Sequence, residues 1–179
     1  MSDEAKHSPD HHKHHHRRDA PVQVPTAIVT VSDSRTLETD SGGALVEAML
    51  GAAGQRVVGR RIVPDEPEAI RAALDQAVAD SDARAVIFTG GTGIASRDVT
   101  PETVEAELDR IIPGFGEIFR MLSYEDIGSA AFLSRALAGL KQGKVVFAIP
   151  GSPGAVRLAM EKLILPELGH LAGEAIKTR

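Results

Sequence analysis

The feature that most constrains the fold is a regular alternation of short apolar runs with longer amphipathic stretches. Short runs rich in Val and Ile are typical of buried strands, whereas apolar residues spaced three and four apart indicate helices. Strands alternating with helices favour right-handed crossovers. The pattern therefore predicts one α/β domain with a mostly parallel β-sheet and helices on both faces. We expect strands at 26–32, 55–63, 83–88 and 144–150, and helices at 41–54, 66–80, 101–111, through most of 115–140, and at 152–168.

Composition agrees with a single domain of this class. The chain has 179 residues, 42% of them hydrophobic but only 3% aromatic, so its core must be built from Ala, Val, Ile and Leu. We expect the domain to span 25–179. Residues 1–24 form a tail with six of the seven histidines and almost no apolar side chains. This composition predicts a disordered leader, and a metal-binding arm is the alternative.

The composition also excludes several classes of function. The chain has no cysteine, which rules out disulfides and thiolate chemistry. His170 is the one histidine outside the tail, so a histidine metal site or a catalytic triad is not available. A net charge of −5 and a pI of about 5.8 argue against a nucleic-acid partner. No signal peptide or membrane-length apolar run is seen, so we expect a cytoplasmic protein with no membrane partner.

The unusual segments of the sequence all follow predicted strands. Ligands of parallel sheets bind outside the carboxyl ends of the strands, so these segments are expected to meet there. The clearest is the GGTG stretch of Gly90, Gly91, Thr92 and Gly93, whose glycines permit positive φ and whose successive amides can bind an anion. It matches neither a dinucleotide-binding fingerprint nor a Walker loop. An ordinary tight turn is the alternative.

Three aspartates follow the same strands, and each has two interpretations. Asp40 is placed to cap the next helix, Asp65 together with Glu68 fits an N-capping arrangement, and Asp98 fits a brace within its own loop. Their convergence beside an anion-binding loop instead indicates a cation between carboxylates and phosphates. Mg²⁺ is typically held by one or two carboxylates plus substrate phosphates. We therefore treat Asp65 and Asp98, with Asp40, as candidate metal ligands for phosphoryl or nucleotidyl transfer.

Hydroxyl and guanidinium groups complete the candidate site. Arg97 is expected to contact a substrate phosphate or to brace the neighbouring Asp98. Gly151 and Ser152 turn a strand into a helix, where their amides suit a second phosphate, although a plain turn explains them equally well. Thr100 and Pro101 look like the N-cap and first residue of the following helix. The other candidates are Ser32, Ser123, Ser134, Arg35 and Arg135.

Four motifs in fixed order resemble the MoaB/MogA family: TGGTGIASRDVTPE (89–102), VPDE (63–66), FLSRA (132–136) and IPGSP (149–153). The family is related to the G domain of gephyrin, and the resemblance covers roughly residues 26–170. It implies that molybdopterin and MgATP are substrates. In active members the terminal phosphate of the pterin attacks the α-phosphate of ATP, which yields adenylylated molybdopterin and pyrophosphate.

The resemblance assigns roles to particular positions. The two essential acidic positions of the family match Asp65 and Asp98, and its hydroxyl positions near the pterin match Ser123 and Ser134. The SDSRT stretch, which carries Ser32 and Asp33 among the candidate ligand-binding residues, and residues 114–128 look like the MoaB branch, in which adenylyl transfer is less general. The resemblance also implies a homotrimer or homohexamer, in line with the apolar content of 111–140, and partners such as a molybdenum insertase.

Three other interpretations remain open at the level of sequence. One is a catalytically silent molybdopterin carrier or scaffold with the same fold. Another is the related domain of CinA-type proteins and MoeA-type insertases, whose additional domains a chain of 179 residues is not expected to accommodate. The third is a flavodoxin-like nucleotide module unrelated to molybdenum.

Overall fold

A six-stranded sheet in the order β2-β1-β3-β6-β5-β4 forms the centre of the molecule, in a computed structural model that describes residues 23–177. The first four strands in this order are parallel, and β5 and β4 run antiparallel to their neighbours, which confirms the mostly parallel α/β fold. The strands are β1 (Thr26–Val31), β2 (Val57–Val63), β3 (Ala85–Thr89), β4 (Arg110–Ile111), β5 (Leu137–Lys141) and β6 (Lys144–Ile149).

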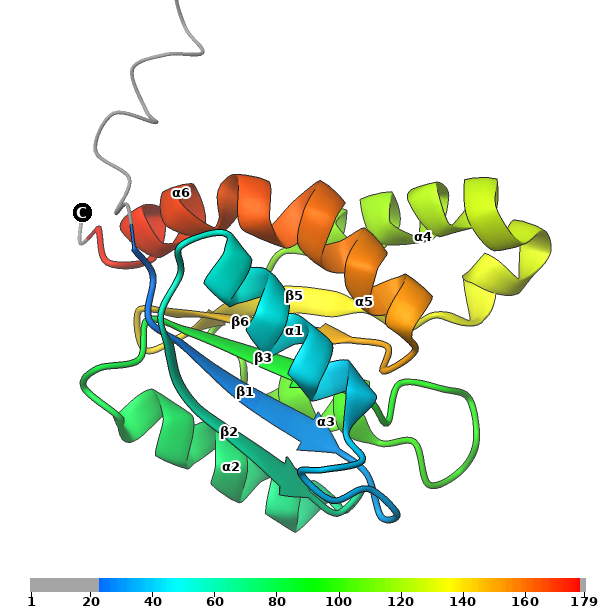
Figure 1. Cartoon of the computed structure of the whole chain (residues 1–179), viewed down its shortest axis with the longest axis horizontal. Coiled ribbons are helices and arrows are strands. Elements are labelled where there is room, and N and C mark those ends of the chain that lie inside the picture. Colours follow the sequence, from blue (N-terminus) through cyan, green and yellow to red (C-terminus); the bar gives the residue numbers. More distant parts are fainter. Residues whose placement is uncertain (1–22, 178–179) are drawn as a thin grey trace, which may run out of the picture.

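Helices cover both faces of this sheet (Figure 1). One face carries α1 (Ser41–Ala52), α4 (Pro113–Ile127), α5 (Pro153–Ala159) and α6 (Leu165–Ala175), and the other carries α2 (Pro67–Ala79) and α3 (Thr100–Glu107). A 3₁₀ segment at Gly128–Leu133 follows α4, and a π-helical turn at Met160–Ile164 joins α5 to α6. Because β1, β3 and β6 are covered on both sides, they are buried along their whole length and consist mostly of apolar residues.

The expected helices before and within 115–140 end earlier than predicted. The helix expected over 101–111 stops at Glu107 and is followed by β4, and the predicted helical region ends at Leu133, before strand β5. A two-residue hairpin at Gln142 (φ 48) and Gly143 (φ 75) pairs β5 with β6. Positive φ at both positions is what a tight hairpin turn requires, so this QG dipeptide is the signal that the helical interpretation missed.

Smaller boundary differences lie at the ends of the domain. The last helical stretch continues to Ala175 instead of ending at residue 168. Val24 is fully buried, with its amide donating to Oε1 of Gln55 (2.7 Å), so the packed domain begins before the predicted residue 25. The prediction of a disordered leader falls mainly on residues 1–22, which lie outside the described part of the chain.

Candidate functional site

Three loops meet at the carboxyl ends of β1, β3 and β6, where the site was predicted. The amide of Gly90 donates to the Ile149 carbonyl (3.1 Å), and a β-carbon on Gly90 would lie 2.4 Å from the Val31 carbonyl oxygen. A β-carbon on Gly151 would in turn lie 3.3 Å from the α-carbon of Gly90. A cavity of about 170 Å³ opens between these loops, and its lining includes Ser32, Arg35, Asp40, Gly42, Gly90 and Gly151.

Two candidate carboxylates pack against the backbone of the loop that begins with the GGTG stretch at residues 90–93, here called the glycine loop. A β-carbon on Gly91, which has φ +60°, would lie 2.7 Å from Oδ2 of Asp65, and one on Gly93 would lie 2.6 Å from Oδ2 of Asp98. Only glycine permits this approach at both positions. Within residues 23–177, the amides of Gly91, Thr92 and Gly93 donate no hydrogen bond to a protein acceptor, so they remain available to an anion.

Asp65 is held by backbone contacts to two other loops. Its Oδ1 accepts from the amide of Val99 (3.2 Å), and its own amide donates to Oδ1 of Asp33 (3.1 Å). It does not cap α2, whose N-cap residue is Glu66. Partial burial raises the pKa of the Asp65 carboxyl, and the negative charges of Asp98 and Asp33 add to this rise, against the opposing Val99 hydrogen bond. A carboxylate under such conditions gains from a bound cation.

Asp98 braces its loop as well as facing Gly93. Its Oδ2 accepts from the amide of Ala95 (3.0 Å), which is the structural role considered for it in the sequence. Its carbonyl accepts from the guanidinium of Arg135, which also donates to the carbonyls of Thr92 (3.4 Å) and Gly93. Arg135 therefore ties the glycine loop to the start of β5. The sequence indicated this arginine only as one of several available cations.

Arg97 does not pair with Asp98, although the two are adjacent in the chain. Its guanidinium forms an ion pair with Oδ2 of Asp33, at the end of β1. The pair links the glycine loop to the loop that supplies Ser32, whose hydroxyl accepts from the amides of Ser34 and Arg35 (both 3.3 Å). Arg97 is still 69% exposed, so the other side of the guanidinium is accessible to an incoming phosphate.

The two hydroxyl residues assigned from the resemblance lie around one cavity, together with a third candidate serine. Ser123 on α4, Ser134 before β5 and Ser152 at the N-cap of α5 all line a cavity of about 160 Å³. Phe119 and Leu158 form part of its apolar wall, and Asp126 contributes a carboxylate. Apolar walls with a few polar groups are typical of a pocket for a small organic ligand.

Asp40 stands apart from the other two candidate metal ligands. It is buried and caps α1, with Oδ1 accepting from the amide of Gly43 (2.9 Å). Its Oδ2 accepts from the hydroxyl of Thr30 (2.8 Å) and faces the guanidinium of Arg60 (3.3 Å). These partners occupy both oxygens, so the structure favours the capping role considered in the sequence over metal binding.

The protein side chains at this site could hold a cation only if a bound ligand supplied further coordinating atoms. Residues 23–177 contain no cluster of three or more His, Cys, Asp or Glu side chains able to hold a metal ion. The predicted convergence of three carboxylates is therefore not seen, and Asp65 and Asp98 remain as a pair. This is compatible with Mg²⁺, which commonly takes one or two protein carboxylates and fills its other positions with water and phosphate oxygens.

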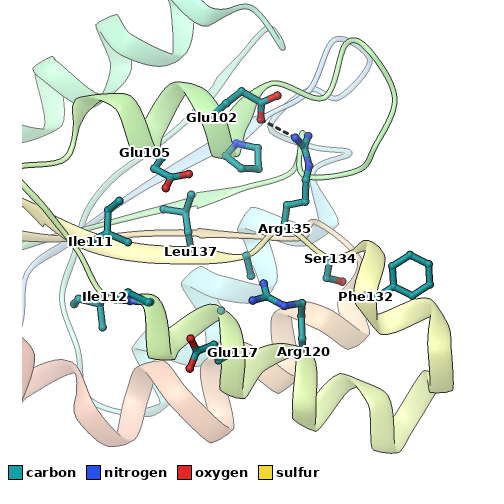
Figure 2. Close-up of a pocket in the computed structure, with 14 residues that line it drawn as sticks. Glu102, Glu105, Ile111, Ile112, Glu117, Arg120, Phe132, Ser134, Arg135 and Leu137 are labelled. Atoms are coloured by element: carbon teal, nitrogen blue, oxygen red, sulfur yellow. Dashed lines mark hydrogen bonds and ion pairs between the residues drawn. The ribbon is translucent and has the colours of Figure 1, made fainter.

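A larger cavity of about 560 Å³ lies beside this site, between α3, α4 and β5. Figure 2 shows Arg135 joined to Glu102 on one side of the cavity, with Arg120 extending from α4 on the other. Apolar side chains line its floor, and Ser134 belongs to both this cavity and the smaller serine-lined one. The two cavities are therefore neighbours, separated at this hydroxyl.

Known proteins are similar to this chain over nearly the whole domain. A family described as a probable molybdopterin binding domain matches residues 27–170. Molybdenum cofactor biosynthesis protein B of Halalkalibacterium halodurans is 52% identical over 165 residues, which cover 92% of this chain and 97% of that protein.

Solved structures agree with the sequence comparison. A crystal structure of molybdenum cofactor biosynthesis protein B is 55% identical with a TM-score of 0.85, over 87% of this chain and 98% of the other. The tungsten cofactor synthesizing protein MoaB of Pyrococcus furiosus is 37% identical with a TM-score of 0.79, over 88% of this chain and 100% of the other.

Among residues 23–177, no helix has the length and apolar character needed to cross a membrane.

Proposed function

The chain belongs to the MoaB/MogA family of molybdopterin-binding domains, and we propose that it acts in molybdenum cofactor biosynthesis as a molybdopterin adenylyltransferase. In the proposed reaction a terminal phosphate oxygen of molybdopterin attacks the α-phosphorus of ATP. The new P–O bond forms as the bond to the β-phosphate breaks, so that adenylylated molybdopterin and pyrophosphate are the products.

The observation that carries this proposal is the contact of Asp65 with Gly91 and of Asp98 with Gly93. Two carboxylates flank Gly91, Thr92 and Gly93, whose amides donate to no protein acceptor within residues 23–177. Carboxylates repel phosphates, so a site that combines them with an anion-binding loop fits a substrate that arrives with a cation. MgATP is such a substrate.

In the proposed reaction the residues of the site have specific roles. The amides of Gly91, Thr92 and Gly93 bind a phosphate, and Asp65 and Asp98 hold the cation, which when bound neutralises charge on the polyphosphate. Arg97 donates to a phosphate oxygen from the Asp33 side of the loop. Ser123, Ser134 and Ser152 orient the polar edges of the pterin in the serine-lined cavity, while Gly151 approaches the backbone of Gly90 and closes the loops around the phosphates.

Incubation with molybdopterin and MgATP tests the proposal. We expect adenylylated molybdopterin by mass spectrometry and one pyrophosphate released per adenylylated pterin. Pyrophosphate must depend on both substrates, so omission of the pterin is the control. Tight pterin binding without pyrophosphate would instead favour the silent carrier or scaffold, the second candidate function. The paired carboxylates argue against a silent carrier, because a carrier does not require a cation beside its phosphate-binding loop.

We further propose that the protein is a homo-oligomer, as a trimer or a hexamer, and that α4 and the segment after it form the contact. Large apolar side chains that are 40–72% exposed gather on these two neighbouring elements. They are Ile118, Met121, Tyr124, Ile127, Phe132 and Leu133. A surface of this kind exceeds the scattered apolar residues of a monomer and marks an interaction site. A molybdenum insertase is the proposed recipient of the product.

A further inference from the structure

Thr100 contains a buried hydroxyl that makes no hydrogen bond. The residue is the first of α3 and fully buried, and its amide donates to the Gly91 carbonyl (3.1 Å), which closes the glycine loop. In the part of the chain that the structure describes, its Oγ1 is the one buried side-chain nitrogen or oxygen without a partner. Thr100 therefore does not act as the predicted N-cap, a position taken by Val99.

A buried hydroxyl without a hydrogen-bond partner lowers the stability of the folded protein. Leaving a buried donor unpaired costs about 1–3 kcal/mol, and native proteins pair nearly all of their buried polar groups. Valine has nearly the same shape as threonine and carries no hydroxyl. A threonine at this position therefore calls for a partner that forms in another state of the protein.

One acceptor nearby is the carboxylate of Asp65. A β-carbon on Gly91 would lie 2.3 Å from Oγ1 of Thr100 and 2.7 Å from Oδ2 of Asp65, so both groups pack against the same glycine. Oδ1 of Asp65 already accepts from the Val99 amide, whereas Oδ2 accepts from no donor within residues 23–177. An unpaired donor thus lies beside an acceptor with free capacity.

We propose that Thr100 is a positioning residue for the cation and phosphate site. When MgATP binds, its hydroxyl donates to the Asp65 carboxylate and fixes the orientation in which Asp65 holds the divalent cation. The ligand itself is not the acceptor, because Oγ1 is fully enclosed. The inference rests on the proposed function, since it assumes that Asp65 holds a cation. Hydrogen bonds to metal-binding carboxylates commonly change metal affinity 10- to 100-fold.

Two substitutions separate positioning from packing. Thr100→Val keeps the shape and removes the hydroxyl, whereas Thr100→Ser keeps the hydroxyl and removes a methyl group. Thr103→Val is the matched control, because Thr103 is also buried on α3 but does not border Gly91. Each protein is titrated with Mn²⁺ at a fixed ATP concentration, followed by the electron paramagnetic resonance signal of free Mn²⁺, well below its melting temperature.

We expect Mn²⁺ affinity to fall about 10- to 100-fold in Thr100→Val and to stay within about 3-fold of wild type in Thr100→Ser and Thr103→Val. Without ligand, Thr100→Val should melt no lower than wild type, since it loses no hydrogen bond. Equal Mn²⁺ affinity in Thr100→Val and wild type would overturn the inference and leave the proposed function intact. Equal losses in the Val and Ser variants would show a packing role and overturn it too. Wild-type protein that binds no Mn²⁺ with ATP would remove the proposed function and this inference together.

Discussion

Gly91 and Asp65 are in direct contact, with the two carboxylate oxygens 2.7 and 2.9 Å from the point where a side chain on Gly91 would begin. Gly91 also has φ +60°, a region that other residues rarely adopt. The glycine therefore serves two purposes, because it turns the loop and leaves room for the carboxylate.

Gly91→Ala should lower stability and activity together. The alanine methyl group would displace Asp65 and Thr100, and positive φ adds a strain of about 1–3 kcal/mol. We expect a lower melting temperature and a large loss of pyrophosphate release. Gly114→Ala is the matched control, since Gly114 lies on α4 with open space around its α-carbon and ordinary φ, and it should melt at or above the wild-type temperature. An unchanged melting curve for Gly91→Ala would contradict the contact.

Asp98→Asn should fold normally and lose at least about 10²-fold in turnover, the usual scale for deleting one preorganised electrostatic group. The amide oxygen of the asparagine can still accept from Ala95, so the loop stays braced. Asp65→Asn should lose activity similarly, and the double variant should be far from additive if both residues hold one ion. Steady-state kinetics beside melting curves measure this. Wild-type turnover in Asp98→Asn would end the catalytic assignment.

Asp40→Asn should show the reverse pattern. The new amide nitrogen would meet the donors of Arg60 and Thr30, so we expect a loss of about 2 kcal/mol in the free energy of unfolding. Turnover at a temperature where the variant is folded should stay close to wild type, because Asp40 caps α1. Denaturant unfolding and initial rates test the two parts separately. A catalytic loss as large as that of Asp98→Asn would return Asp40 to the metal site.

The raised pKa of Asp65 predicts a dependence of stability on pH. Because the folded-state pKa lies above the unfolded value of about 3.9, the folded protein loses stability as pH rises between these two values. Asn at this position does not titrate. Asp65→Asn should therefore melt above wild type at pH 7, and the difference should shrink as pH falls from 7 toward about 4. A melting difference that stays constant across this pH range would show that the pKa of Asp65 is not raised.

Light scattering should give a mass that is a multiple of 18.9 kDa, corresponding to a trimer or a hexamer. Met121→Glu combined with Ile127→Glu places charges on the exposed apolar face of α4 and should lower the mass to that of the monomer. Leu37→Glu is the control, since Leu37 is 52% exposed but lies outside this face. A wild-type monomer at micromolar concentration would contradict the proposed contact.

Local patterns in the sequence predicted most of the fold and the position of the site. The apolar runs of β1, β3 and β6 and the amphipathic spacing of α2 depend on neighbours in the chain, and parallel strands necessarily bring their following loops to one edge. The glycines of the GGTG stretch likewise indicated positive φ, which Gly90 and Gly91 confirm. The same reasoning extended the helices before β4 and β5 beyond their observed ends, and it missed β5 because it overlooked the turn at Gln142 and Gly143.

The tertiary structure alone decided which polar groups are partners. Asp40 and Asp98 carry the same carboxylate and follow similar strands, yet Arg60 and Thr30 occupy the first while the second faces Gly93. Arg97 pairs with Asp33 instead of its neighbour, and Thr100 is buried beside Asp65 without a hydrogen bond. Several of these relationships join residues 20 or more positions apart in the sequence, such as Arg60 with Asp40 and Arg97 with Asp33. They depend on the packing of whole elements against one another, whereas strands, helices and glycine turns depend on the few residues around them.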